Sequence, residues 1–276
     1  MGDYKINGKS LSDFGITAIS ANSSNLAVSG VWDLPKRKGN VSYEWKESDG
    51  VEAFVDADDM LFEGRSISFS GVMNLLAGQT IEQQITAFRS YIDTISKGLF
   101  TLDSPWGVWQ VQMSADLNIA RRGNSMAEIE ITLLEPVPDL SGDLPQSTGV
   151  GNDIDGYAWE ELGVYITSVS GASNIPLRKT IDVTSYEENN QTVYGGKQTQ
   201  KIILSGIIIA DDYEEFKKKI GGLYALFTKP GLREYRYNGV TYKCFAPDGF
   251  TINNLILAYK ISATWNISLT TADDDE

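Results

Sequence analysis

Most of the chain alternates between apolar and polar residues, which is the pattern of strands in a sheet with one buried face. Alternating segments begin at Val41, Ser66, Val108, Ala127, Glu234 and Ile261. The sequence YNGV at Tyr237–Val240 adds an Asn-Gly pair, which is the strongest short-range signal of a β-hairpin. We therefore predict a mostly β protein built from antiparallel strands.

Two segments depart from this alternation and carry apolar residues three or four positions apart, as amphipathic helices do. They cover about residues 80–97 and 211–227. Thr80 and Asp211 stand where helix-capping residues belong, and Gly98 follows the first segment as a stop signal. Each segment has one apolar stripe and one charged face, so we expect each helix to pack one side against a sheet.

An internal repeat relates the two halves of the chain. Four segments recur in the same order, paired as Asp13–Ser20 with Glu161–Ser170, Leu34–Lys38 with Ile175–Lys179, Ser66–Met73 with Lys201–Ile208, and Ala127–Pro136 with Ala263–Ala272. Many β-proteins share similar strand and turn sequences, so one such match could arise by chance. Four paired segments in the same order indicate a duplicated domain.

The repeat predicts the fold class and the domain boundaries. We expect an α+β, mostly β chain with two tandem related antiparallel β-sandwich or barrel domains, each with one packed α-helix. The domains cover residues 1–138 and 157–272. A segment rich in Gly, Pro, Ser and Asp at 139–156 is the predicted linker, and 273–276 is the predicted acidic tail.

Composition narrows the classes of function. The 276 residues include 23 Lys and Arg, 37 Asp and Glu and no His, which gives a formal net charge of -14. Binders of nucleic acid or anionic membranes need basic stripes, so neither class is favoured. The lack of His removes Ser-His-Asp and Cys-His catalysis and His-ligated zinc. We expect the single cysteine, Cys244, to be a buried thiol, because it lies at an alternating position among Tyr and Phe.

Candidate sites for chemistry are weak. The acidic groups at 56–59 and 153–161 lack the spacing of a calcium loop, so we interpret them as solvated loop charge. No Walker loop, GxSxG, HExxH or CxxC motif occurs. We therefore predict no enzyme activity, no cofactor and no metal. A glycosidase, which needs two carboxylates in one cleft, stays a remote alternative. The longest apolar stretch, Ile202–Ala210, is shorter than the roughly 20 residues of a membrane span.

A basic loop and a hairpin are the candidate contacts with other subunits. The densest basic run is Pro35–Gly39, and a solvated charged face is its simplest explanation. The alternative is that this basic loop of an acidic protein pairs with an acidic neighbouring subunit and sets register more than affinity. The segments 41–45 and 51–55 would form an extended hairpin that reaches a neighbour. The candidate interface residues are Lys36, Arg37, Lys38, Val41, Tyr43, Trp45, Arg178 and Lys179.

The N-terminal stretch INGKSLSDFGI, followed by a β-rich region, a strand that ends in Ser-Gly and one helix, resembles the start of siphophage distal tail proteins and related tail-tube folds. The resemblance covers about the first 136 residues, and the second half through the repeat. It implies β-sandwich or barrel domains that ring a lumen through which DNA passes, without a cofactor. It also implies a virion tail protein, assembled in the bacterial cytoplasm, that joins the tail tube to the receptor-binding tip.

The second half departs from the usual family pattern, in which the second domain resembles a galectin-type carbohydrate module. A second tube-like copy is similar instead to baseplate hub proteins, in which three chains form a pseudo-sixfold ring. The expected partners are further copies of this chain, as a hexameric ring or a pseudo-sixfold trimer, and other tail proteins of a phage or prophage. The alternative function is a carbohydrate-binding β-sandwich adhesin.

Overall fold

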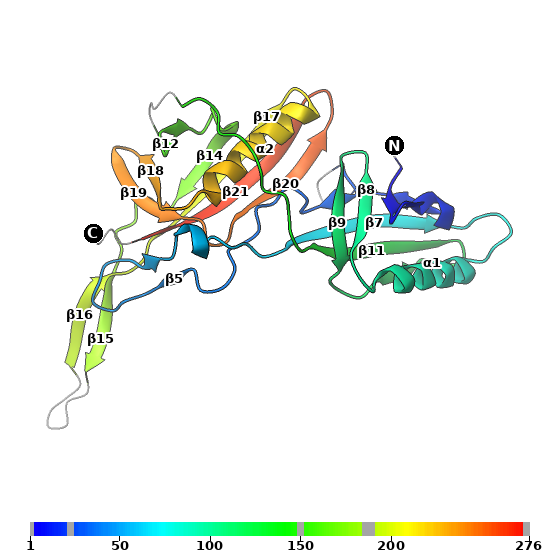
Figure 1. Ribbon diagram of the computed structural model, residues 1–276, viewed down its shortest axis with the longest axis horizontal. Helices are drawn as coiled ribbons and strands as arrows, with labels where there is room; N and C mark the ends of the chain where they lie inside the picture. Colours follow the sequence, from blue (N-terminus) through cyan, green and yellow to red (C-terminus); the bar gives the residue numbers. More distant parts are fainter. Residues whose placement is uncertain (1–2, 21–24, 148–151, 184–190, 273–276) are drawn as a thin grey trace. The chain divides into compact units, whose positions relative to one another are not determined.

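The residues that the structure describes fold mainly into antiparallel strands, with two α-helices among them (Figure 1). The computed structural model describes residues 3–20, 25–147, 152–183 and 191–272. The predicted acidic tail and residues 148–151 of the predicted linker lie outside the described residues. The predicted fold class, mostly β with one helix for each of two β-bodies, is confirmed.

The contacts within the chain define two compact units, and neither is continuous in sequence. Unit 1 comprises Met1–Asp33, Gly64–Asp139 and Ile252–Ala258. Unit 2 comprises Leu34–Glu63, Leu140–Thr251 and Tyr259–Glu276. Two segments therefore do not follow a division of the chain into consecutive halves: 34–63 belongs to unit 2, and 252–258 belongs to unit 1.

The sheet of unit 1 is antiparallel throughout its central path. Its strand order is β2 (Lys9–Ser10), β1 (Lys5–Ile6), β8 (Phe100–Ser104), β9 (Gly107–Met113), β11 (Met126–Glu135), β7 (Arg65–Asn74) and β3 (Ile16–Ala18). β10 (Asn118–Arg121) pairs with β11, and β4 (Val28–Ser29) pairs with β7. The longest pairing joins β7 to β11 over ten residues, with Gly71 opposite Ile129.

The sheet of unit 2 repeats this order strand for strand. Its path is β13 (Tyr157–Ala158), β12 (Asp153–Ile154), β18 (Arg233–Tyr237), β19 (Val240–Phe245), β21 (Ile261–Thr271), β17 (Lys201–Ala210) and β14 (Val164–Ser170). β20 (Phe250–Leu257) lies between β19 and β21 in the chain, as β10 lies between β9 and β11. Gly206 faces Trp265 in the central pair, which matches Gly71 and Ile129 in unit 1.

The first turn of each unit explains why the opening stretch recurs in the sequence. Asn7 and Gly8 join β1 to β2 with φ angles of +48° and +77°, and Asp155 and Gly156 join β12 to β13 with +53° and +80°. Two consecutive residues with positive φ form the tight turn whose twist suits a β-hairpin, and Asn, Asp and Gly tolerate that backbone best.

Each helix follows the equivalent long strand and has a side-chain cap. α1 (Ile81–Ile95) begins at Thr80, whose Oγ1 accepts a hydrogen bond from Gln83 N while Gln83 Oε1 accepts one from Thr80 N. α2 (Tyr213–Thr228) begins at Asp212, whose carboxylate accepts from Glu215 N at 2.8 Å. The predicted cap at Asp211 is therefore wrong by one residue. Asp211 N, one residue before the cap, donates instead to the Glu215 carboxylate, so Glu215 secures the residue that precedes the cap and not the backbone N–H of the cap itself.

The segment that follows unit 1 packs against α2 through glycines. A Cβ on Gly142 would lie 2.0 Å from Gly221 O, and a Cβ on Gly221 would lie 3.2 Å from Gly142 Cα. Glycine inside a helix costs up to about 1 kcal/mol relative to Ala. Gly221 suits this contact, because a Cβ there would require the neighbouring backbone to move by a few tenths of an ångström, whereas a Cβ on Gly222 would be in ordinary contact with Asp143 O at 3.4 Å.

Each unit has its own apolar core between sheet and helix. In unit 1, Phe88 of α1 packs edge-on against Phe14, at 5.1 Å between ring centroids. In unit 2, Trp265 lies 5.3 Å from Trp159 and 6.2 Å from Phe250 by the same measure. Cys244 is fully buried, which confirms the predicted core thiol, and burial raises its pKa to about 12. No helix in the described ranges is long and apolar enough to cross a membrane.

Candidate subunit interface

The candidate interface residues lie in two segments, both of them in unit 2. The first segment contains the short hairpin of β5 (Ser42–Tyr43) and β6 (Glu52–Ala53). The second contains the hairpin of β15 (Arg178–Val183) and β16 (Gln191–Lys197). The two hairpins occupy equivalent positions in the repeat, because each follows the edge strand, β3 or β14, and precedes the long strand, β7 or β17.

Lys179 joins the two hairpins. Its Nζ donates hydrogen bonds to the backbone carbonyls of Trp45, Ser48 and Gly50, which satisfies all three donors of an ammonium group. The Glu44 carboxylate lies 3.5 Å from the same nitrogen. Lys179 is 7% exposed, so its charge fixes the loop between β5 and β6 and is not displayed at the surface.

Backbone contacts strengthen this junction. Gly50 N donates to Lys197 O at 2.9 Å, and Lys197 N donates to Asp49 Oδ1 at 2.6 Å. A Cβ on Gly195 would lie 2.1 Å from Lys46 O, and one on Gly196 would lie 2.0 Å from Ser48 O. The two glycines of β16 therefore permit the close approach of the loop, which the sequence analysis did not anticipate.

Arg37 is also buried within the chain. It is 5% exposed, and its Nη2 donates to the carbonyls of Phe54 and Asp59. Burial lowers the pKa of its guanidinium, and the nearby Asp59 carboxylate opposes that shift. Its Nε and Nη1 are buried without a hydrogen-bond partner among the described residues. A cavity of about 10 Å³ beside Arg37 is about the size of one water.

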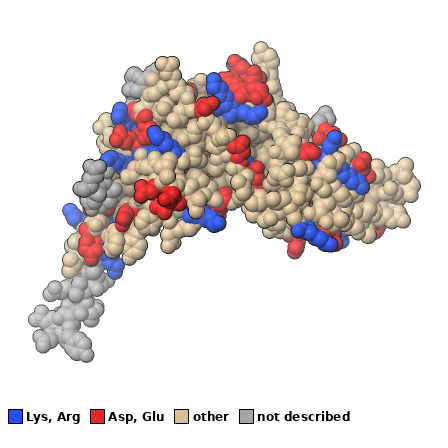
Figure 2. All heavy atoms as spheres, viewed as in Figure 1, with Lys and Arg blue, Asp and Glu red and all other residues tan. Residues whose placement is uncertain are grey.

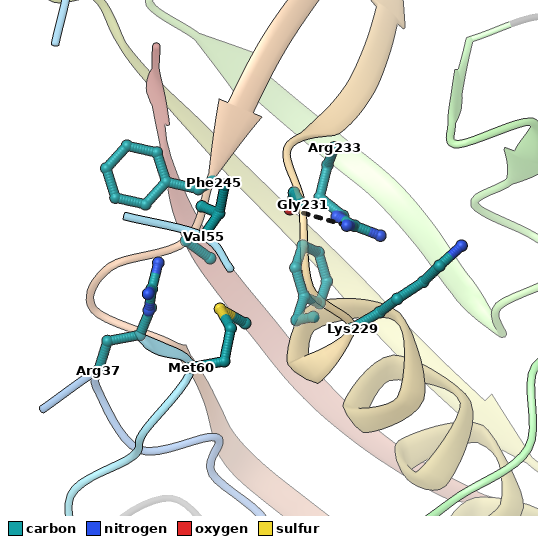
Figure 3. A pocket seen from close by; sticks show the side chains of 9 residues that line it. Arg37, Val55, Met60, Lys229, Gly231, Arg233 and Phe245 are labelled. Atoms are coloured by element: carbon teal, nitrogen blue, oxygen red, sulfur yellow. Dashed lines mark hydrogen bonds between the residues drawn. The ribbon is translucent and has the colours of Figure 1, made fainter. Parts of the chain in front are cut away.

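The cations around this small pocket do not converge on one point. Figure 3 shows the charged ends of Arg37 and Arg233 on opposite sides, with Val55 and Met60 between them. Arg233 is already bonded to the Asp155 carboxylate at 2.6 Å and to the carbonyls of Pro230 and Gly231. The geometry is therefore that of a structural arginine pair, and it does not form an anion-binding site.

The remaining candidates are more accessible. Lys36, Lys38 and Arg178 are exposed, and Lys36 pairs with Glu63 at 3.4 Å. Val41 is half-buried. Tyr43 and Trp45 are about half exposed and pack edge-on at 4.5 Å between centroids, and Trp45 Nε1 donates to Glu52 at 2.8 Å. An exposed aromatic pair held in place in this way suits contact with another molecule.

Two exposed apolar residues beside this set were missed. Ile175 is 91% exposed and Leu177 is 72% exposed, directly before Arg178. The repeat pairs Ile175 with Leu34, which is only 2% exposed, so the sequence marked the two positions as equivalent but could not show that their burial differs. The apolar side chain at this position of the repeat is therefore covered in the first half of the chain, at Leu34, and exposed in the second half, at Ile175.

The surface charge is mixed. On the face drawn in Figure 2, Lys and Arg lie among Asp and Glu and form no separate basic patch. Within the described ranges, no group of three or more His, Cys, Asp or Glu side chains is placed to hold a metal ion. A half-open cavity of about 210 Å³ lies in unit 2 beside α2, and both acidic and basic side chains line it, among them Asp143, Glu215 and Lys218.

No protein-family model matches the chain, and no curated protein matches its sequence. Among solved structures, the Dit protein of phage SPP1 is similar over 98% of this chain and 98% of its own, with 8% identity and a TM-score of 0.35. That protein is described as a paradigm of the hub adsorption apparatus in phages that infect Gram-positive bacteria. At this level of similarity, the likeness identifies neither the family nor the function of the chain.

Proposed function

We propose that the chain is a structural, non-enzymatic component of a phage tail or of a tail derived from a prophage. In this role it forms a ring adaptor between the tail tube and the tail tip, as a hexamer or a pseudo-sixfold trimer. DNA passes through the ring without specific binding, and other tail proteins contact its faces. The protein is assembled in the bacterial cytoplasm and resides in the virion tail.

The duplicated strand order is the observation that supports this proposal most. Seven strands follow the same path in each unit, and one helix lies at the same point of each path. Two copies of one module present similar surfaces twice, and closed rings are built from surfaces that recur around an axis. Edge strands such as β3 and β14 end the sheet paths, and pairing edges between subunits satisfies their exposed backbone groups.

The charge of the chain agrees with passage of DNA. Its net charge is -14, and the face in Figure 2 carries no basic patch. An acidic lumen repels phosphate and lets DNA slide, whereas a basic lining holds it.

Electron microscopy of the purified protein tests the proposal. At high concentration, negative-stain images should show rings, and light scattering should give a mass of several chains. Tail proteins encoded by neighbouring genes should promote ring formation where the chain alone forms few rings. A protein that stays monomeric at high concentration, with and without those partners, would contradict the proposed role.

The exposed aromatic pair favours one alternative function, a carbohydrate-binding adhesin. Tyr43 and Trp45 present ring faces and edges beside the carboxylate of Glu52, and such amphipathic groups suit polar ligands with apolar faces. A glycan array distinguishes the two functions. A ring adaptor should give no hits, whereas an adhesin should bind a defined set of glycans and lose them in the Trp45→Ala variant.

A further inference from the structure

The turns at Gly30 and Gly171 occupy the same place in the two repeats. The φ angles of these glycines are +81° and +85°. In each turn, the residue three positions later donates its backbone N–H to the glycine carbonyl, at 3.3 Å and 3.1 Å. A Cβ would lie 2.2 Å from Ser66 O in β7 or 2.0 Å from Lys201 O in β17. The chain therefore leaves both sheets through the same turn, which sets Leu34 equivalent to Ile175.

After these turns, the two equivalent segments have opposite environments. Leu34 is buried and forms an antiparallel bridge with Phe250, with N–O distances of 3.0 Å and 3.2 Å. Gly249 makes room for it, because a Cβ there would lie 2.0 Å from Leu34 O. Ile175 is 91% exposed and Leu177 is 72% exposed. The same apolar position is thus a core residue in the first repeat and an uncovered residue in the second.

The surface that receives Leu34 also has a counterpart. Leu34 pairs with Phe250, the first residue of β20, next to Gly249 at the end of the connection from β19. The equivalent connection in unit 1 runs from Ser114 to Leu117 between β9 and β10. Ser114, Ala115 and Asp116 are exposed. Among the described residues, no isolated β-bridge involves this connection. Each chain therefore carries one open segment, 175–177, and one open receiving strip, 114–117.

We propose that the segment Ile175–Leu177 of one copy packs on the strip Ser114–Leu117 of a second copy, as Leu34 packs on Phe250 within one chain. The partner is a second copy of the chain, because each copy carries both the segment 175–177 and the strip 114–117, and both surfaces are exposed to solvent in the single chain. The inference rests on the proposed assembly role, and it names the contact through which the copies join. The two surfaces differ, so the contact is head-to-tail, and repeated use closes a ring or extends a filament.

Sedimentation velocity of the full chain tests the proposal. The Ile175→Glu variant should weaken self-association by about tenfold or more, because it removes the apolar side chain from the contact and brings a carboxylate to a strip that already contains Asp116. Tyr259→Glu is the matched control, since Tyr259 is 94% exposed and lies outside both surfaces; this variant should associate as the parent chain does. Both variants should keep the parent's melting temperature, because both side chains are exposed in the single chain.

A cysteine pair tests the same contact directly. The full chain with Ala115→Cys and Ile175→Cys, mildly oxidised with diamide, should give a ladder of covalent multimers on a non-reducing gel. Cys244 is fully buried and so does not compete. Each single variant should give no ladder, and the pair Ala115→Cys with Tyr259→Cys should give none either.

The outcomes separate this inference from the proposed function. Rings that form equally well with Ile175→Glu and show no 115–175 crosslink would overturn the contact and leave the ring adaptor standing. A protein that neither associates nor crosslinks at high concentration would overturn the contact, and tail partners that also fail to assemble it would contradict the adaptor. Weakened association together with a crosslinked ladder would support the contact.

Discussion

At the scale of single residues, Asp33 is a half-buried carboxyl group whose raised pKa makes stability depend on pH. Burial raises its pKa to about 6 from 3.8, against a backbone hydrogen bond from Ile252 N and the nearby charge of Arg65. A folded-state pKa above the unfolded one means that the folded protein binds the proton more tightly. The contribution of Asp33 to stability is therefore present below about pH 4 and is lost as the pH rises through 6.

The Asp33→Asn variant removes this titration and keeps an oxygen that can accept from Ile252 N. The difference in unfolding free energy between variant and parent should move in the variant's favour by about 2 kcal/mol from pH 4 to pH 7. Urea unfolding at a series of pH values measures this difference, and titrations common to both proteins cancel. A difference that stays constant across this range would show that the carboxyl is not perturbed.

The burial of a residue could be predicted from the sequence only where the pattern of its sequence neighbours determines it. The burial of Cys244 follows from alternation along one strand, and it was predicted. The burial of Lys179 depends on three carbonyls of a loop more than a hundred residues earlier. Arg37 likewise depends on Phe54 and Asp59. The pattern of charges identified both residues as noteworthy, but it could not indicate that they are buried in their own chain.

At the scale of elements, periodicity predicted both helices and most long strands, because each has one face on a core. The short hairpin was less well defined, since β5 and β6 have only two paired residues each. The packing of the 140–146 segment on α2 was not predictable, because the glycines that allow it lie far apart in sequence. Gly142 and the pair Gly221 and Gly222 look locally like ordinary linker and helix-weakening residues.

This packing gives an element-scale prediction for Gly142→Ala. The added Cβ would lie 2.0 Å from Gly221 O, so either the segment or the helix must shift, at a cost of about 1–3 kcal/mol. Gly98→Ala is the matched control, because a Cβ there has nothing within 4 Å. Chemical denaturation should show a clear loss of stability for Gly142→Ala and little change for Gly98→Ala. Equal stability of the two variants would mean that the close approach is not maintained in solution.

At the scale of the whole molecule, the repeat was visible in sequence because turns and strand ends keep their residue types. The grouping of segment 34–63 with unit 2 was not visible. Nothing local to Leu34 indicates that Phe250 will cover it, and the counterpart Ile175 has a similar sequence context with the opposite burial. Long-range pairing of this kind is decided by the surfaces that the rest of the chain provides.

This grouping predicts how the chain opens locally. Ile131 in β11 and Ile267 in β21 are equivalent buried residues of units 1 and 2, and Ile→Val costs about 0.5–1.5 kcal/mol at such a site. The amide of Leu34 bonds to Phe250 O and that of Arg37 to Pro247 O. Native-state hydrogen exchange of both amides should accelerate up to about tenfold in Ile267→Val, and should change little in Ile131→Val. Because each variant serves as the control of the other, acceleration by Ile131→Val alone would assign the segment to unit 1 instead.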